Sequence, residues 1–166
     1  MIKIQTLHSE VITFLKLYSF FNSSVKERIE MLIATGDLDN ENAYEAVKQK
    51  YNHIILESFN FSKLIKNSYL ERRIKEITGN DIIILDHKDE SIIGVSCIAC
   101  NYIVFESKED AYYEICPVCM WQNDGKKDNE YSGSNHCTLN DYKNTDEFRK
   151  KLILGNEKYV KNIKVI

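Results

Sequence analysis

Apolar residues recur every three or four positions through the first half of the chain, which is the spacing of one buried helix face. One such stripe predicts a helix over residues 5–21. Ser24 and Glu27 form a capping-box pattern that predicts a second helix ending before Gly36. A third is expected from about residue 40, continuing through residue 59, and a fourth over residues 62–78 with Gly79 as its C-cap. Residues 1–80 are therefore predicted to form a helical region.

The pattern changes at residue 81, where a short run of β-branched residues predicts a strand over residues 81–85. Residues 91–96 are expected to be its return partner, and residues 102–105 and 112–115 are expected to form a β-hairpin. Residues 122–136 have the composition of a loop. Thr138 is expected to cap a final helix that Gly155 closes. The predicted fold class is α+β, with a domain boundary between residues 80 and 81.

Composition changes this picture only by excluding classes of protein. The chain has 166 residues, 43% of them apolar, which suffices for a folded core. Its apolar runs are much shorter than the ~20 residues that span a bilayer, and the first 21 residues lack the features of a secretory signal. We therefore expect a cytoplasmic protein with no membrane partner.

Charge is distributed unevenly along the chain. Residues 81–130 carry 4 Lys and Arg against 11 Asp and Glu, a net charge of −7, whereas the whole chain carries −3. Nucleic acids are bound through Lys and Arg, so this acidic segment disfavours them and suits a basic protein partner. A solvated acidic surface without any partner remains an alternative interpretation.

Four of the five cysteines occur as two CxxC pairs, Cys97 with Cys100 and Cys116 with Cys119. Two such pairs at this separation are typical of a zinc site in which each pair forms a tight loop, or knuckle, that directs both sulfurs at one ion. The first knuckle is residues 97–100 and the second is residues 116–119. Since four thiolates fill a tetrahedron, we expect one structural zinc ion and no catalytic position. The predicted module is a zinc-ribbon-like β-hairpin followed by a C-terminal helix, over residues 81–166.

The residues that follow the knuckles agree only in part with this prediction. Knuckle geometry favours a residue that tolerates a positive φ after the second cysteine, and Asn101 meets this requirement. Met120, at the equivalent place in the second knuckle, suits it poorly. Pro117 fixes one φ angle between the second pair of ligands.

Other roles for the cysteines are less well supported by the sequence. A disulfide framework is disfavoured by the length of the chain and the lack of an export signal. A thioredoxin-like redox pair, Cys116 and Cys119, is disfavoured by the second CxxC at zinc distance. Cys137 follows His136, and adjacent residues in extended chain point to opposite sides, so a small buried cysteine is the expected role. With no catalytic constellation apparent, the chain is not predicted to be an enzyme.

The second knuckle and its neighbours resemble a known family. Tyr113-Glu114-Ile115 leads into Cys116-Pro117-Val118-Cys119-Met120-Trp121-Gln122-Asn123-Asp124, and Ser132-Gly133-Ser134-Asn135-His136 and Thr138-Leu139-Asn140 follow. This sequence is similar to that of the bacterial cysteine-rich CPCC domain family over about residues 92–155. The first knuckle departs from the family, since Ile98-Ala99 replaces its Pro-Cys. The resemblance implies a small zinc-ribbon-like module, which in some members looks like an immunity protein encoded beside a polymorphic or contact-dependent toxin.

Three functions remain open on these grounds. The leading hypothesis is an immunity-type protein that binds and neutralises a cognate toxin, itself expected to be basic. Its candidate contact residues are Tyr112, Tyr113, Trp121 and Asp124, although Trp121 is better explained by packing against the second knuckle and the final helix. The alternative is a zinc-ribbon nucleic-acid-binding regulator that uses the basic last segment. A thiol oxidoreductase is the third.

Overall fold

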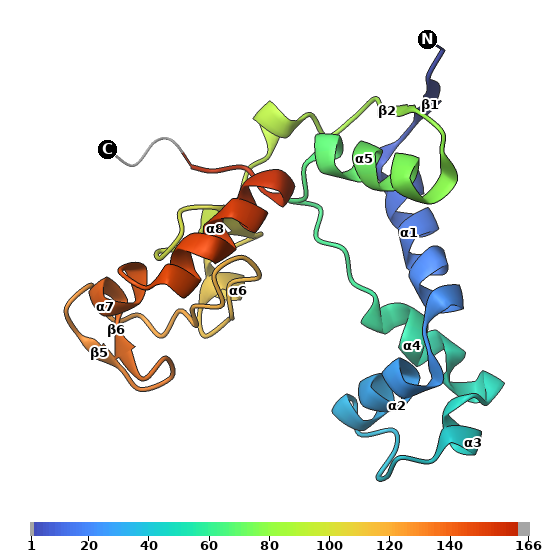
Figure 1. The fold of residues 1–166 in the computed structure, drawn as a ribbon, viewed down its shortest axis with the longest axis horizontal. Helices are drawn as coiled ribbons and strands as arrows, with labels where there is room; N and C mark the ends of the chain where they lie inside the picture. The colour runs from blue at the N-terminus through green and yellow to red at the C-terminus, as the bar shows by residue number, and fades with distance from the viewer. Residues whose placement is uncertain (1, 163–166) are drawn as a thin grey trace. The chain divides into compact units, whose positions relative to one another are not determined.

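A computed structural model describes residues 2–162, with the side chain of Leu154 outside the description (Figure 1). The chain divides into two compact units: one comprises Met1–Gln5 and Ser62–Ile166, and the other comprises Thr6–Phe61. The fold is α+β, as predicted, with helices and three two-stranded sheets in the described residues. None of the helices described combines the length and the apolar character needed to cross a membrane.

The unit formed by Thr6–Phe61 is helical. Its longer helices are α1 (His8–Asn22) and α2 (Val25–Ala34). The predicted capping box forms at α2, where the Ser24 side chain accepts from the backbone N–H of Glu27 and the Glu27 carboxylate accepts from the backbone N–H of Ser24. The long third helix expected from residue 40 is instead three short elements: α3 (Ala43–Ala46), the 3-10 turn η1 (Gln49–Tyr51) and α4 (Asn52–Ser58).

A small apolar core holds these helices together. Leu32, Leu38, Ala46 and Ile55 are buried in it, with partly buried aromatic residues packed around them. Arg28 is also buried, and its guanidinium donates to the Ala46 carbonyl and to Asn52 Oδ1 at 3.2 and 2.7 Å. The side chain thus connects α2 to the chain on both sides of η1 and satisfies buried polar groups.

In the other unit, α5 (Asn67–Thr78) packs against β2 (Ile82–Ile84). Gly79 ends α5 in the left-handed conformation, with φ 76°, as predicted. The sequence placed this helix with the N-terminal helices, but it lies in the same unit as the cysteines. The Glu71 carboxylate accepts from the backbone N–H of Ile84 at 2.9 Å and connects α5 to β2.

The strand partners differ from those expected. β2 pairs with β1 (Ile4–Thr6) and not with residues 91–96. Those residues end in β3 (Val95–Ser96), which pairs antiparallel with β4 (Ile103–Phe105) around the first knuckle. The hairpin expected between residues 102–105 and 112–115 is absent from the described structure. The reason is local: Ser107 accepts from the backbone N–H of Asp110 and caps α6 (Lys108–Ala111), which turns the chain away from β4.

Residues 122–136, which were predicted to be a loop, contain the short strand β5 (Tyr131–Ser132). This strand pairs with β6 (Cys137–Thr138). Thr138 caps a helix, as expected, but that helix is the short α7 (Leu139–Lys143). Thr145 caps a separate helix, α8 (Asp146–Lys158), because its side chain accepts from the backbone N–H of Phe148. Gly155 does not close the helix and lies within α8.

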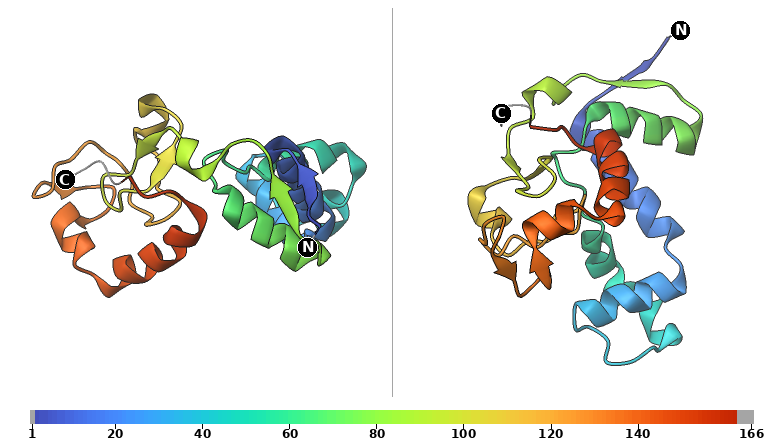
Figure 2. Two further views of the ribbon diagram at one scale, coloured as in Figure 1. Left: turned by 90° about the horizontal axis from the view of Figure 1, so that it is seen from above. Right: turned by 60° about the vertical axis from the view of Figure 1, so that its left-hand side comes forward.

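At Gly155, α8 comes into close contact with the second knuckle. A Cβ atom there would lie 2.3 Å from Val118 Cγ1 and 3.2 Å from Tyr102 Cε2. Figures 1 and 2 both show α8, in red, lying along the segment that carries the knuckles. The glycine is therefore a requirement of packing and not of helix termination.

The chain beyond α8 adds a further strand-like segment beside the first knuckle. The backbone N–H of Ile103 donates to the Val160 carbonyl at 2.9 Å, and that of Asn162 donates to the Asn101 carbonyl at 2.8 Å. Tyr159 forms an isolated β-bridge with Ile65. The segment therefore joins the first knuckle to the chain that precedes α5.

Replacing Gly155 with alanine tests this packing. Alanine is the better helix former by about 1 kcal/mol, but the added methyl group collides with Val118, a stiff side chain, and overpacking costs about 1–3 kcal/mol. We expect Gly155→Ala to lower the free energy of unfolding measured by urea titration. Gly133→Ala is the matched control, because open space surrounds that position, and it should change stability by less than about 0.5 kcal/mol. Equal effects of the two substitutions would contradict the proposed contact.

Candidate metal centre

The first knuckle is a tight turn between β3 and β4. The backbone N–H of Asn101 donates to the Cys97 carbonyl, and that of Cys97 donates to the Tyr102 carbonyl, both at 2.9 Å. The N–H of Ala99 points at Cys97 Sγ from 3.4 Å. Asn101 has φ 65°, the left-handed conformation that its position requires.

The second knuckle repeats this geometry. The N–H of Met120 donates to the Cys116 carbonyl and the N–H of Cys116 donates to the Trp121 carbonyl, both at 2.9 Å, while the N–H of Val118 lies 3.4 Å from Cys116 Sγ. Met120 adopts φ 63° although its type tolerates that region poorly. The closure of the knuckle therefore overrides the local preference of the residue.

Four sulfurs meet where the knuckles face one another. Sγ of Cys97 is 3.6 Å from Sγ of Cys119, Sγ of Cys100 is 3.6 Å from Sγ of Cys116, and all four lie within 4.8 Å of one another. A tetrahedral ion with metal–sulfur bonds of about 2.3 Å places its sulfurs about 3.8 Å apart. The four cysteines predicted as ligands are thus brought together at the spacing that one metal ion requires.

The cluster is closed to solvent. All four cysteines are buried, and no histidine or carboxylate of the described residues joins the group. Hydrogen bonding to Cys100 and the other sulfurs lowers the pKa of the Cys97 thiol, while hydrogen bonding to Cys116 and Cys119 raises the pKa of the Cys100 thiol. Four thiols this close together compete for protons, and a divalent cation would take the place of these protons.

The C-terminal helices cover the cluster on the side of the second knuckle. The Tyr142 hydroxyl of α7 donates to the carbonyl of Cys119, one of the four cysteines. The Tyr142 ring lies 5.4 Å from that of Trp121, and the Tyr102 hydroxyl donates to the Leu152 carbonyl of α8 at 3.1 Å. Aromatic side chains therefore join both knuckles to the helices.

Asn135 fixes the loop between the second knuckle and α7. Its side-chain Oδ1 accepts from the backbone N–H of Gln122 at 2.9 Å, and its Nδ2 donates to the Gln122 carbonyl at 2.8 Å. The same amide bonds to the fully buried Ser132 hydroxyl. The Asn135 side chain thus pairs with both backbone groups of Gln122, as a neighbouring strand would do.

The four residues predicted to contact a partner are divided by the structure. Tyr112 and Tyr113 are 57% and 54% exposed, and their rings pack edge to face at 4.4 Å. Asp124 is half-buried and lies near enough to contribute to a raised pKa of Tyr112, after the larger effect of Tyr113. Trp121 is only 1% exposed and packs on Tyr142, which agrees with the packing alternative for this residue.

Cys137 stands apart from the four-sulfur cluster. It is half-buried, and its thiol donates to the Asn135 carbonyl at 3.3 Å. Burial raises the pKa of this thiol, with a smaller contribution from Asp141, so the side chain is poorly suited to act as a nucleophile.

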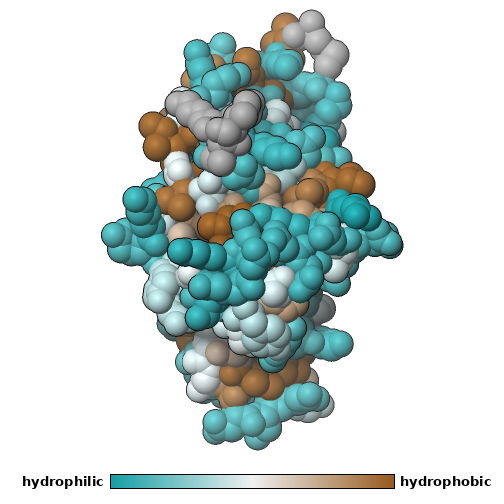
Figure 3. Space-filling view, turned by 90° about the vertical axis from the view of Figure 1, so that its left-hand side faces the viewer, coloured by the Kyte–Doolittle hydropathy of each residue, from teal (hydrophilic) through white to brown (hydrophobic). Residues whose placement is uncertain are grey.

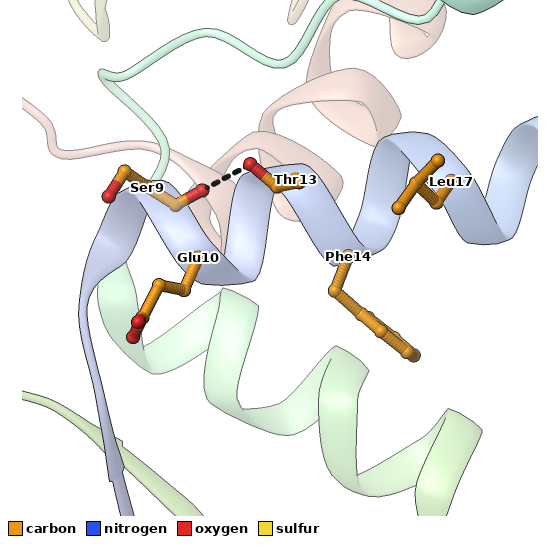
Figure 4. Close-up of a pocket in the computed structure, with 5 residues that line it drawn as sticks. All are labelled: Ser9, Glu10, Thr13, Phe14 and Leu17. Carbon is orange, nitrogen blue, oxygen red and sulfur yellow. Dashed lines mark hydrogen bonds between the residues drawn. The ribbon is translucent and has the colours of Figure 1, made fainter.

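A pocket also lies on α1 in the other unit (Figure 4). Phe14 and Leu17 give it an apolar wall, and the Thr13 hydroxyl that borders it donates to the Ser9 carbonyl at 2.8 Å. Its lining comes from one helix and contains no group of potential metal ligands.

Taken together, two knuckles, four buried sulfurs and covering helices define a metal-binding, zinc-ribbon-like module. Residues 95–150 match the model of the family described as Cysteine-rich CPCC. The match covers about a third of the chain, and for this segment it confirms the resemblance inferred from the sequence. No curated protein and no solved structure matched the chain.

The cysteine spacing predicted the four sulfurs but not the residues that hold them in place. Tyr142, Asn135 and Gly155 act through contacts with the second knuckle that only the folded chain reveals. All three lie within the residues, about 92–155, that resemble the family, and Asn135 lies in one of the stretches that carry the resemblance.

The metal centre predicts different outcomes for two cysteine substitutions. Cys116→Ser removes a ligand from the closed cluster, so we expect the chain to lose its metal, about one ion per molecule, together with the folded structure of the knuckles. Metal analysis and circular dichroism on the purified chain measure both effects. Cys137→Ser, the matched control outside the cluster, should keep the metal. A full metal content in Cys116→Ser would contradict the four-cysteine site.

Proposed function

We propose that the metal is zinc and that its role is structural. Four thiolates are a donor set that zinc prefers, and they leave no position at which water or a substrate could bind. The two knuckles have equivalent hydrogen bonds, which supports a site built to hold one ion symmetrically. In this proposal the chain is not an enzyme.

We further propose that the protein binds and neutralises a cognate bacterial toxin. The observation that carries this proposal is the combination of a closed metal site with exposed aromatic side chains in an acidic segment. Tyr112 and Tyr113 form an exposed pair beside Asp124, and tyrosine is among the residues enriched at protein interfaces. The immunity role itself comes from the family resemblance.

The charge of the segment supports a basic partner. Residues 81–130 carry a net charge of −7, and zinc with four thiolates would add a formal charge of −2 at its centre. Complementary charge speeds the association of such partners. On the face shown in Figure 3, hydrophilic residues predominate and the hydrophobic areas are small and separate. A contact of mixed aromatic and acidic character fits such a surface better than an extensive apolar one.

The nucleic-acid alternative receives less support. Several basic side chains of α7 and α8 are engaged with carboxylates, as in the pairs Lys143 with Asp128, Arg149 with Asp146 and Lys151 with Glu147. Phosphate binding would have to compete with these ion pairs and with the acidic segment in the same unit.

Binding to the toxin encoded beside this chain tests the proposal. We expect the zinc-loaded chain to bind the purified toxin domain and to restore growth when both are expressed together, with affinity that weakens as salt is raised. The double substitution Tyr112→Ala and Tyr113→Ala should weaken binding by about tenfold or more, measured by calorimetry. Tyr44→Ala, at an 89% exposed position in the other unit, is the matched control and should have no effect.

Two results would contradict this function. One is the absence of binding to the neighbouring toxin together with no effect on growth. The other is a mobility shift of DNA or RNA by the zinc-loaded chain at physiological salt, which would favour the nucleic-acid alternative.

A further inference from the structure

A pocket of about 530 Å³ lies beside the first knuckle, separate from the four sulfurs. Ile98 of the knuckle and Leu139 at the start of α7 give it an apolar wall, and Asn101 adds a polar group. Its volume is within the range of about 300–1,000 Å³ that small-molecule sites occupy. The pocket lies in one unit, formed by segments that the first knuckle and the loop before α7 bring together.

Three lysines surround this pocket. Lys126 and Lys127 come from the loop after the second knuckle, and Lys143 comes from the end of α7. The Lys143 ammonium is paired with Asp128 at 3.4 Å. Among the residues described by the structure, no carboxylate lies within ion-pair distance of the Lys126 or Lys127 ammonium groups. The lining therefore has a net charge of +2, in a segment that is otherwise strongly acidic.

The loop that carries the two lysines is held in place by its own hydrogen bonds. The backbone N–H of Asn140 donates to the Asp128 carbonyl at 3.1 Å, and the Asn140 side chain donates to Asn129 Oδ1 at 2.6 Å. The Glu130 carboxylate accepts from the backbone N–H of Lys127 at 2.9 Å. The backbone that carries the two lysines is thus kept at the pocket, and an anion between their ammonium groups would relieve the repulsion between these like charges.

We propose that this pocket binds a phosphate group, held by Lys126 and Lys127 with Asn101 as a polar neighbour. Phosphate near pH 7 carries a charge between −1 and −2 and accepts several hydrogen bonds, so it balances the +2 lining. A carboxylate would balance only one of the two ammonium groups. The bound phosphate group belongs either to a free phosphate ion or to a small organic phosphate whose apolar part contacts Ile98 and Leu139.

A second role for the lysines makes a different prediction. The four-thiolate zinc centre has a formal charge of −2, and ammonium groups near the first knuckle could serve only to offset it. In that case removing the lysines would weaken zinc binding, and the intact chain would bind no phosphate.

Calorimetric titration of the zinc-loaded full chain at constant ionic strength tests the proposal. Inorganic phosphate and adenosine monophosphate are the probes, with sodium chloride as the blank. We expect saturable binding of phosphate or of both probes. The double substitution Lys126→Gln and Lys127→Gln should weaken it by about tenfold or more, because charge-assisted hydrogen bonds are lost. If the nucleotide binds more tightly than phosphate, the ligand of the pocket is an organic phosphate. If the two bind with similar affinity, the ligand is the free phosphate ion.

Two further variants complete the design. Lys150→Gln, at an exposed position of α8, is the matched control and should leave binding unchanged. Lys126→Arg with Lys127→Arg keeps the charge and should keep binding within about threefold, which separates loss of charge from damage to the loop. The proposal is overturned if neither probe binds saturably to the wild-type chain, or if the glutamine variant binds as tightly as wild type.

Discussion

The unit that contains the cysteines depends on the meeting of its two knuckles at four sulfurs. Each knuckle is a short turn that places a non-glycine residue, Asn101 or Met120, in the left-handed region. Such turns cost conformational energy, and four thiols in a buried cluster repel one another once they lose protons. A divalent cation bound to the four sulfurs would remove that repulsion and fix the distance between the knuckles. The regular secondary structure around them, a two-residue strand and a three-residue strand at the first knuckle, is too short to do so alone.

The rest of the unit is arranged around this centre. Trp121, which follows the second knuckle, is buried and packs against the Tyr142 ring. The Tyr142 hydroxyl donates a hydrogen bond to the Cys119 carbonyl. Helix α8 lies so close to Val118 that Gly155 is needed at the contact. The segment after α8 then returns to the first knuckle through Ile103. Both knuckles are thereby connected to the same C-terminal segment. A change in the distance between the knuckles would therefore disturb the packing of the C-terminal helices.

How far the sequence predicted this structure depends on the range of each interaction. The Ser24 capping box, the Gly79 C-cap and the Thr138 cap involve neighbours within about four residues, and all three were predicted correctly. The cysteine spacing predicted the four-sulfur cluster because the ligand chemistry permits few alternatives. The predicted partner of β2 was wrong, because the strand that pairs with it comes from the start of the chain. The predicted role of Gly155 as the end of a helix was also wrong, because Gly155 lies within the helix against Val118. Neither long-range contact leaves a periodic pattern in the sequence.

Hydrogen exchange before and after chelation shows whether the metal holds one unit of the chain together. Amide protons are compared, residue by residue, in the metal-loaded chain and in the same chain treated with a metal chelator under reducing conditions. We expect protection to be lost in both knuckles, β4 and α8, while α2 and α4 stay protected by the core around Leu32 and Ile55. Protection of the knuckles and α8 that persists without metal would contradict it.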